Sequence, residues 1–450
     1  MSQSLTIAKF GGTSVADFEA MSRSAELLLA NKQVGLVVLS ASAGMTNLLI
    51  SLAQGPEQNQ RVQIIDKIHH IQHSIIDSLD NPAVIRDEID LMLDNITTLS
   101  EAAALATSSA LADELVSHGE LMSTLLFVEI LRQRGVEALW FDVRKVMRTS
   151  ARFGHAEPDI AVLTQLASSQ LKPRLSEGLV VTQGFIGCEA KGRTTTLGRG
   201  GSDCTAALLA EALAASQIDI WTDMPGIYTT DPRIVPSAKR IDELTFEEAA
   251  EMATFGAKIL HPATLLPAVR SNIPVFVGSS LAPLEGRTCV SSTTLSQPLF
   301  RALTLRRKQI LLTLHSLNML HARGFLAEIF SILARHHISV DLITTSEVSV
   351  ALTLDTAGST FSGDSPLSQE LLAELSSLCR VEVEQDLALV ALIGNSLSSA
   401  RGVGDKVFGI LSPFNLRLIC YGASSYNLCF LVSEADAKHV VQRLHDHLFE

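Results

Sequence analysis

Short apolar runs alternate with helical patterns over roughly the first 290 residues of the chain. The apolar and β-branched runs predict strands at residues 5–8, 36–41, 179–184, 218–222 and 273–278. Between the second and third runs, apolar residues recur at helical spacing from about residue 59 to residue 135. Alternating strands and helices indicate an α/β domain with a mostly parallel sheet.

The last part of the chain contains an internal repeat. Segments beginning at Gly324 and Gly402 align without a gap, at an offset of 402 − 324 = 78 residues. The alignment places Phe330 on Phe408, and each unit has the split βαβ pattern of a ferredoxin-like fold. Because residues 279–299 are rich in Ser, Thr, Pro and Gly, we predict domains at 1–294 and 300–450. The second domain would hold two interleaved units, at about 310–385 and 386–450.

Composition limits the class of protein. Of 450 residues, 47% are hydrophobic, and 35 basic against 48 acidic residues give a net charge of −13. This excludes global disorder and gives no basic face for a nucleic acid. Six scattered cysteines without a CxxC pair indicate reduced thiols, and no apolar run approaches the length of a membrane span. We therefore expect a cytoplasmic protein with no secretory leader and no membrane partner.

The first candidate site is "KFGGTS", between a predicted strand and a predicted helix. Glycines there let backbone N–H groups approach a phosphate, and the helix N-terminus adds positive potential. Lys9 contributes a mobile cation beside Gly11 and Gly12. On its own, the stretch fits a phosphate cradle and a tight turn equally well.

A second glycine-rich loop is "LGRGGSDC", which begins at Leu197. Its glycines precede a helix for which we predict Ser202 or Asp203 as N-cap, and Arg199 adds a two-pronged donor. The loop lacks the last glycine of a dinucleotide fingerprint. The nearby "GCEAKGRT" has arginine where a P-loop requires lysine, so neither motif is present.

Further polar stretches interrupt the apolar pattern. "TDMPGIYTTDPR" opens at the carboxyl end of a predicted strand, where ligands of open α/β sheets bind, and "FGAKILHPAT" contains Lys258. "SASAGMTN" and "SHGELMS" are the others, and Glu120 in the latter needs a partner if it is buried. His69 and His73 stand four residues apart with no third ligand nearby, so we assign no metal-binding residues.

These six motifs, in this order and followed by a duplicated tail, resemble those of aspartate kinases. The tail resembles most the monofunctional, lysine-sensitive bacterial type. The resemblance implies an amino-acid kinase fold followed by ACT units, and transfer of the γ-phosphoryl group of ATP, with Mg²⁺, to the side-chain carboxylate of L-aspartate. That reaction gives 4-phospho-L-aspartate and opens the pathway to lysine, threonine and methionine.

The resemblance also implies roles for individual residues. Catalytic roles fall on Lys9, Asp203 and Lys258. Aspartate would be bound by Thr46, Glu120, Arg199 and Ser202. ATP would be bound by Lys9, Gly11, Gly12, Thr222, Asp223, Tyr228, Arg233, Lys258 and Ile259.

For the tail, the resemblance implies that L-lysine inhibits allosterically from an ACT interface. The residues lining that site would be Met319, Ala322, Gly324, Phe325, Leu326, Ser339, Val340, Asp341, Ser346 and Glu347. Ala322 departs from the family pattern, in which a serine is expected, and the second repeat has Ile419 in place of Asp341. Pairing of ACT units implies a homodimer or a dimer of dimers.

Other functions fit less well. Glutamate 5-kinase, acetylglutamate kinase and uridylate kinase share the glycine loops but lack this combination with two ACT units. A fused homoserine dehydrogenase would need several hundred more residues and a dinucleotide fingerprint. The rival from another class is a catalytically inactive amino-acid sensor, against which the intact Lys9, Arg199 and Asp203 argue.

Overall fold

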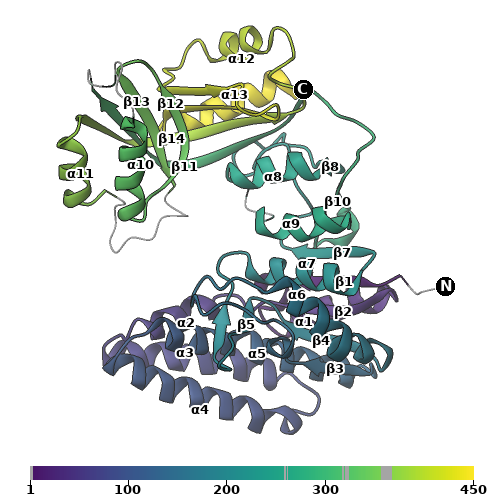
Figure 1. The fold of residues 1–450 in the computed structure, drawn as a ribbon. Helices are drawn as coiled ribbons and strands as arrows, with labels where there is room; N and C mark the ends of the chain where they lie inside the picture. Colours follow the sequence, from purple (N-terminus) through teal and green to yellow (C-terminus); the bar gives the residue numbers. More distant parts are fainter. Residues whose placement is uncertain are drawn as a thin grey trace. The chain divides into compact units, whose positions relative to one another are not determined.

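A computed structural model describes residues 4–449 except 258–259, 261, 317–318, 320–323 and 356–366, and leaves the side chains of 262–265 and 355 undescribed. The chain divides into two compact units (Figure 1). The first unit comprises Met1–Ile227, Arg240–Ala250 and Lys258–Leu295. The second comprises Tyr228–Lys239, Glu251–Ala257 and Ser296–Glu450.

The first unit contains an eight-stranded sheet in the order β3-β4-β2-β1-β7-β9-β10-β8. All neighbours pair in parallel except β9 and β10, so the expected parallel sheet is present. The strands are β1 (Thr6–Phe10), β2 (Val34–Leu39), β3 (Ala138–Phe141), β4 (Leu179–Gln183), β7 (Gln217–Thr222), β8 (Glu243–Thr245), β9 (Val275–Ser279) and β10 (Arg287–Ser291). A hairpin of β5 (Ile186–Cys188) and β6 (Thr194–Thr196) stands apart from this sheet.

Helices surround the strands of the first unit, and α4 lies outermost, at the bottom of Figure 1. The helices are α1 (Phe18–Ala30), α2 (Met45–Ala53), α3 (Gln58–Ile76), α4 (Ala83–Leu105), α5 (Ser109–Gln133), α6 (Ile160–Leu166), α7 (Gly201–Leu213), α8 (Phe246–Thr254), whose last residues fall in the second unit, and α9 (Pro262–Ser271). Short single turns are η1 (Gly12–Val15), η2 (Val143–Lys145), η3 (Ala167–Leu171), η4 (Lys172–Ser176) and η5 (Pro283–Glu285).

Helix α5 is the centre of the main hydrophobic core. Every residue from Leu115 to Leu131 is buried, as expected of a helix enclosed on all sides. Its Phe127 lies 6.3 Å from Phe10 of β1, centroid to centroid. A helix held this firmly is a rigid support for any polar side chain that it carries.

The second unit contains a six-stranded antiparallel sheet in the order β12-β13-β11-β14-β16-β15. Its strands are β11 (Phe300–His315), β12 (Ser339–Thr345), β13 (Ser349–Asp355), β14 (Arg380–Gly394), β15 (Leu418–Tyr421) and β16 (Asn427–Ser433). Its helices are α10 (Phe325–Arg335), α11 (Gln369–Ser376), α12 (Val403–Leu411) and α13 (Ala437–Leu448).

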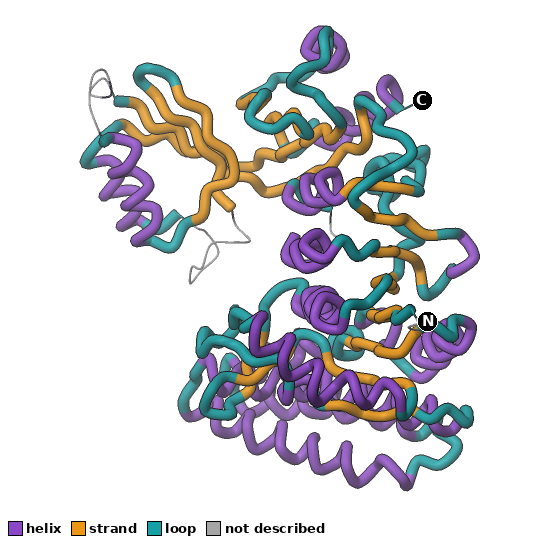
Figure 2. Tube along the Cα trace, turned by 45° about the vertical axis from the view of Figure 1, so that its right-hand side comes forward, coloured by secondary structure: helices purple, strands orange, loops and turns teal. Residues whose placement is uncertain are grey.

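The two long strands β11 and β14 run through both halves of this sheet. Residues 311–315 of β11 pair with β13 and with the start of β14, whereas residues 300–306 pair with the end of β14. The register shifts in between, where Lys308 and Asp386 have φ of 56° and 55°. Figure 2 shows the long strands bending along their length. Each half has its own hydrophobic core, so the predicted interleaving of two units is confirmed.

Candidate active site

The central ion pair of the candidate site joins Lys9 and Asp203. Lys9 is the fourth residue of β1, Asp203 lies in the first turn of α7, and Nζ and Oδ1 are 2.5 Å apart. Both side chains are at least 85% buried, with 10% and 15% exposed. An ion pair shielded from water in this way holds the ammonium group in one place.

The N-terminus of α7 differs from the expectation. Its N-cap is Gly200, in the left-handed region with φ of 73°, and no side chain caps the helix. Ser202 and Asp203 lie inside the first turn, so the prediction that one of them is the N-cap is wrong. The left-handed conformation favours glycine, which outweighed the usual preference for serine or aspartate. The first-turn N–H groups therefore carry no side-chain cap and suit an anion.

The glycines after β1 pack directly against neighbouring loops. The Gly11 N–H donates to the carbonyl of Trp221 at 3.0 Å, and a Cβ on Gly11 would lie 3.6 Å from Nζ of Lys9. A Cβ on Gly12 would lie only 2.9 Å from the carbonyl oxygen of Ala41. "KFGGTS" and "SASAGMTN" thus form one surface, with the lysine amine above the first glycine.

Glu120 projects from α5 toward the same loop. One carboxylate oxygen accepts the Ala41 N–H at 3.2 Å, and the other has no hydrogen-bond partner among the described residues. Burial raises the pKa of Glu120 to about 8. The carboxyl group is therefore mostly neutral at pH 7, and a cation beside its second oxygen would favour the ionised form. Ser123 ties the loop to α5 through the Ser40 carbonyl at 2.9 Å.

The remaining predicted substrate residues stand on loops and at the starts of helices. Thr46 is the second residue of α2, whose N-cap Gly44 is left-handed and lacks a side-chain cap. Ser202 packs against the backbone of Gly184, where an added Cβ would meet it at 2.5 Å. Arg199 is exposed.

The loops after β7 and β9 complete the same edge of the sheet. Thr222 donates to its neighbour Asp223 at 3.1 Å and accepts the Ser280 N–H through its carbonyl at 2.9 Å. Ser14 and Ser280 share a buried hydrogen bond of 2.7 Å. The carboxyl ends of β1, β7 and β9 therefore meet, at the kind of edge where ligands of open parallel sheets bind.

Four further residues are predicted to bind the nucleotide. Tyr228 and Arg233 belong to the second unit, where Arg233 forks onto Asp231 at 2.8–3.2 Å. Lys258 and Ile259 lie outside the described residues.

The predicted effector residues gather on three segments of the second unit. Gly324 is the left-handed N-cap of α10, and Phe325 and Leu326 open that helix. Ser339, Val340 and Asp341 begin β12, and Ser346 and Glu347 follow that strand. Met319 precedes α10, while Ala322 lies outside the described residues. The Asp341 carboxylate is 3.0 Å from Nη1 of Arg306 on β11.

Comparison with known proteins identifies the family. The amino acid kinase family model matches residues 4–279, and an ACT domain model matches residues 390–448. Lysine-sensitive aspartokinase 3 of Escherichia coli (strain K12) is 72% identical over 446 residues, 99% of either chain. The chain belongs to the aspartokinases. Aspartokinase 1, chloroplastic, of Arabidopsis thaliana is 34% identical, over 99% of this chain and 80% of that one.

Two solved structures resemble this aspartokinase closely. E. coli aspartokinase III in complex with aspartate and ADP (R-state) superposes with a TM-score of 0.92 at 72% identity. The same enzyme in complex with lysine and aspartate (T-state) gives 0.85. Each covers 99% of this chain and 100% of the other. The predicted family, amino-acid kinase fold and kinase class are confirmed by these matches.

Sequence reasoning did not predict the contacts that Ser14, Asp113 and Ser280 make in this aspartokinase. Ser14 is the last residue of "KFGGTS", to which no role was assigned, and Ser280 directly follows β9. A serine directly after a glycine loop or a strand was the only signal available. Asp113 had the same signal as Glu120, a charge on an apolar helix, and its contacts are described below.

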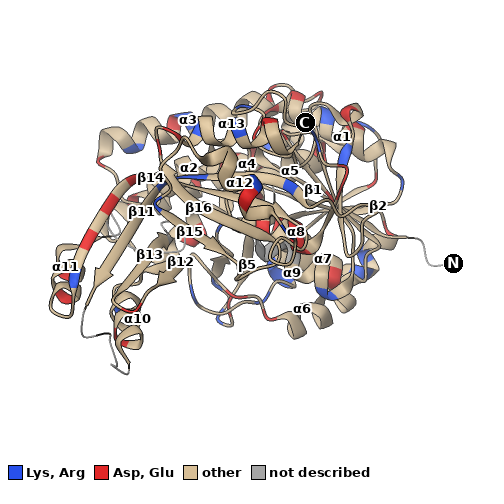
Figure 3. Ribbon diagram, turned by 90° about the horizontal axis from the view of Figure 1, so that it is seen from above, with Lys and Arg blue, Asp and Glu red and all other residues tan. Residues whose placement is uncertain are grey.

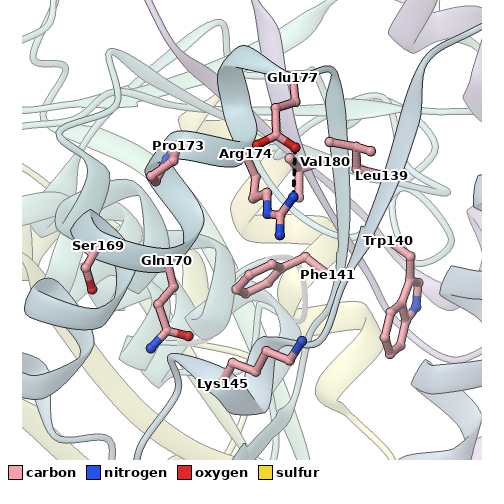
Figure 4. A pocket seen from close by; sticks show the side chains of 10 residues that line it. All are labelled: Leu139, Trp140, Phe141, Lys145, Ser169, Gln170, Pro173, Arg174, Glu177 and Val180. Carbon is pink, nitrogen blue, oxygen red and sulfur yellow. Dashed lines mark hydrogen bonds and ion pairs between the residues drawn. The ribbon is translucent and has the colours of Figure 1, made fainter.

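The cavity drawn in Figure 4 does not coincide with the predicted site. It measures about 600 Å³ and lies beside β3, an edge strand three places from β1 in the sheet. None of its lining residues is a predicted site residue, and its Arg174 is paired with Glu177 at 2.8 Å. Figure 3 shows acidic and basic residues interspersed in both units, so an anion depends on local groups such as Lys9. Among the described residues, no helix is long and apolar enough to cross a membrane.

Proposed function

We propose that this aspartokinase transfers the γ-phosphoryl group of ATP to the side-chain carboxylate of L-aspartate, giving 4-phospho-L-aspartate and ADP. The observation that carries the proposal is the shielded Lys9–Asp203 pair beside the glycine loop and the uncapped start of α7. The relative with the same overall structure was crystallised with aspartate and ADP.

The chemistry makes modest demands on the protein. The side chain of aspartate has a pKa of about 3.9, so it is already an ionised nucleophile at pH 7 and needs no general base. What remains is to align two anions and to neutralise charge on the phosphoryl group in transfer. Lys9 supplies the positive charge, Gly11 and Gly12 let backbone groups approach, and Asp203 fixes the lysine.

The amino-acid substrate would be held by a carboxylate and by its ammonium group. Arg199 would fork onto a carboxylate, and Glu120 would receive the ammonium group at its oxygen that lacks a described partner. Thr46 and Ser202 would complete the pocket. Because burial favours the neutral form of Glu120, binding of the ammonium group would lower the pKa of Glu120 and release its proton to solvent.

ATP would be bound with Mg²⁺. The nucleotide residues are Lys9, Gly11, Gly12, Thr222, Asp223, Tyr228, Arg233, Lys258 and Ile259. Among the described residues no group of three or more His, Cys, Asp or Glu side chains forms a metal cage. Mg²⁺ usually keeps several of its waters and is held by substrate phosphates with one or two carboxylates. Asp203 and Asp223 are the carboxylates available, and the ion would offset charge on the phosphate oxygens.

The second part of the chain would regulate the first. We assign catalysis to residues 1–294 and regulation to residues 300–450, where L-lysine would bind at the effector residues named above. ACT units work in pairs, so we propose a homodimer or a dimer of dimers. The six free cysteines fit a cytoplasmic location.

A coupled assay tests this function. Aspartyl phosphate is trapped as hydroxamate in the presence of ATP and Mg²⁺, with and without millimolar lysine. Wild type should form it and be inhibited by lysine, whereas Lys9→Ala should form none and still bind lysine. Undiminished hydroxamate formation by Lys9→Ala would overturn the catalytic assignment, and inhibition by threonine instead of lysine would overturn the effector.

A further inference from the structure

The carboxylate of Asp113 is fully engaged by groups from two other segments. Its Oδ2 accepts the N–H groups of Thr196 at 2.8 Å and Gly154 at 2.9 Å. Its Oδ1 accepts the Thr196 hydroxyl at 2.9 Å and shares the Gly154 N–H at 3.1 Å. The residue is 4% exposed. Hydrogen bonds to a charged acceptor that is shielded from water are among the stronger ones in proteins.

These contacts fix the base of the loop that carries Arg199. Thr196 is the last residue of β6 and stands three residues before Arg199. Its carbonyl also accepts the Ala156 N–H at 2.8 Å. Next along the loop, a Cβ on Gly198 would lie 2.6 Å from Nδ1 of His155. The turn at 154–156 and the start of the 197–200 loop therefore form one packed layer.

Arg199 depends on this support. Its side chain is exposed, and among the described residues its guanidinium has no hydrogen bond or ion pair. Nothing in the described chain therefore orients the guanidinium directly, and its position follows from the loop backbone. That backbone is held at its start by Asp113.

Asp113 and Glu120 stand on the same buried helix. They are seven residues apart on α5, about two turns or 10.5 Å along the axis, and so face the same side. One rigid element thus holds the carboxyl group for the substrate's ammonium and the clamp for the loop with the guanidinium. The distance between the two ends of the substrate pocket is set by α5.

We propose that Asp113 is a positioning residue for the amino-acid substrate: it holds the Arg199 loop at a fixed distance from Glu120 and so sets the affinity for aspartate without touching it. The inference rests on the proposed function, because it takes Arg199 and Glu120 as the groups that bind aspartate. The nucleotide side should be unaffected, since Gly11 and Gly12 are held through Trp221 and Ala41.

The decisive variant is Asp113→Asn in the full-length chain. The amide has a single acceptor oxygen, and its NH₂ group faces N–H donors, so at least one contact is lost. We expect the KM and the Kd for aspartate to rise about tenfold, with the KM for ATP and the Kd for ADP within about twofold of wild type. Glu129→Gln is the matched control, a buried carboxylate on α5 that accepts from Gln133, and it should change none of these values.

Thr196→Val is a second variant that keeps the test open if Asp113→Asn fails to fold. It removes the hydroxyl contact and leaves both N–H contacts, so we expect a two- to fivefold rise for aspartate alone. Equal weakening of aspartate and nucleotide, or an unchanged aspartate Kd in a folded variant, would refute the positioning role. Calorimetric Kd values test the positioning role without any need for catalysis. If wild type forms no aspartyl phosphate, that result refutes the proposed function and leaves the calorimetric test of Asp113 in place.

Discussion

The guanidinium of Arg306 lies 3.0 Å from the carboxylate of Asp341, the residue to which we assign the effector's cation. The two side chains are only 16% and 14% exposed. The stem of Arg306 also lies against Gly256, where an added Cβ would meet its Cγ at 2.5 Å. Gly256 stands two residues before Lys258. An ammonium group bound at Asp341 would therefore compete with a cation of the chain itself, and that cation touches the segment leading to a proposed nucleotide residue.

Arg306→Ala should strengthen lysine binding while weakening its effect. Removing the internal cation takes one ion-pair partner from Asp341, so the Kd for lysine should fall about three- to tenfold, the scale of one partly buried ion pair. Inhibition at saturating lysine should become incomplete, because the side chain that lysine displaces is gone. Calorimetry and activity assays measure the two effects.

The control for that experiment is Arg307→Ala, which alters a looser neighbouring pair, 3.8 Å from Glu434. It should leave lysine binding as in wild type. A Kd for lysine that stays the same or rises in Arg306→Ala would show that the two cations do not compete.

Aspartate binding should depend on pH through Glu120. Burial raises its pKa to about 8, so the free protein holds the proton at pH 7, whereas the substrate's ammonium group needs the ionised form. The Kd for aspartate should fall about tenfold per pH unit between pH 6 and 7.5 and level off above about 8.5. At pH 7, Glu120 should release close to one proton for each aspartate bound. Calorimetry in buffers of different ionisation enthalpy measures this number.

The same shift predicts a stability effect of known sign. The folded-state pKa lies above the ordinary value of 4.5, so the folded protein binds this proton more tightly than the unfolded chain does. The contribution of this proton to the free energy of unfolding is full below pH 4.5 and is lost as the pH rises through about 8. Glu120→Gln should therefore melt higher than wild type at pH 9 and bind aspartate weakly, with no dependence on pH. A pH-independent Kd in wild type would contradict the assignment.

The two glycines of "KFGGTS" should respond differently to the same change. A Cβ on Gly12 meets a backbone oxygen at 2.9 Å and forces the two loops apart, whereas one on Gly11 makes ordinary contacts of 3.5 and 3.6 Å. Displacing a phosphate loop by a fraction of an ångström is costly, so Gly12→Ala should lower kcat/KM about 100-fold. Gly11→Ala should lower kcat/KM less than tenfold. Steady-state kinetics on both, with melting temperatures as a check of folding, would settle the order, and equal activities would disprove it.

Sequence reasoning predicted which motifs lie close together in those cases where the motifs directly follow strands. "KFGGTS" and "TDMPG" converge because the carboxyl ends of β1 and β7 meet in one parallel sheet, which the alternation of elements predicts. The contacts of Asp113 were beyond reach, because its partners are 41 and 83 residues away and depend on how α5 crosses two loops. The pairing of Arg306 with Asp341 likewise depends on the tertiary fold of the second unit, which no local pattern encodes. The N-cap of α7 was missed because backbone geometry overrode side-chain preference.

The shared strands β11 and β14 make the two regulatory units unequal. The first regulatory unit is one continuous block between the bends at Lys308 and Asp386. The second regulatory unit is assembled from residues 300–306 and the chain after 386. Both junctions of the nested block lie on strands that pair with each other, near Gln309 and Leu387. A single exchange of this block would replace all the residues to which we assign the effector and would keep the pairing of residues 300–306 with the end of β14. Recombination at these two points would exchange the assigned effector residues as one block, and during synthesis the inner unit is complete before the outer one can close.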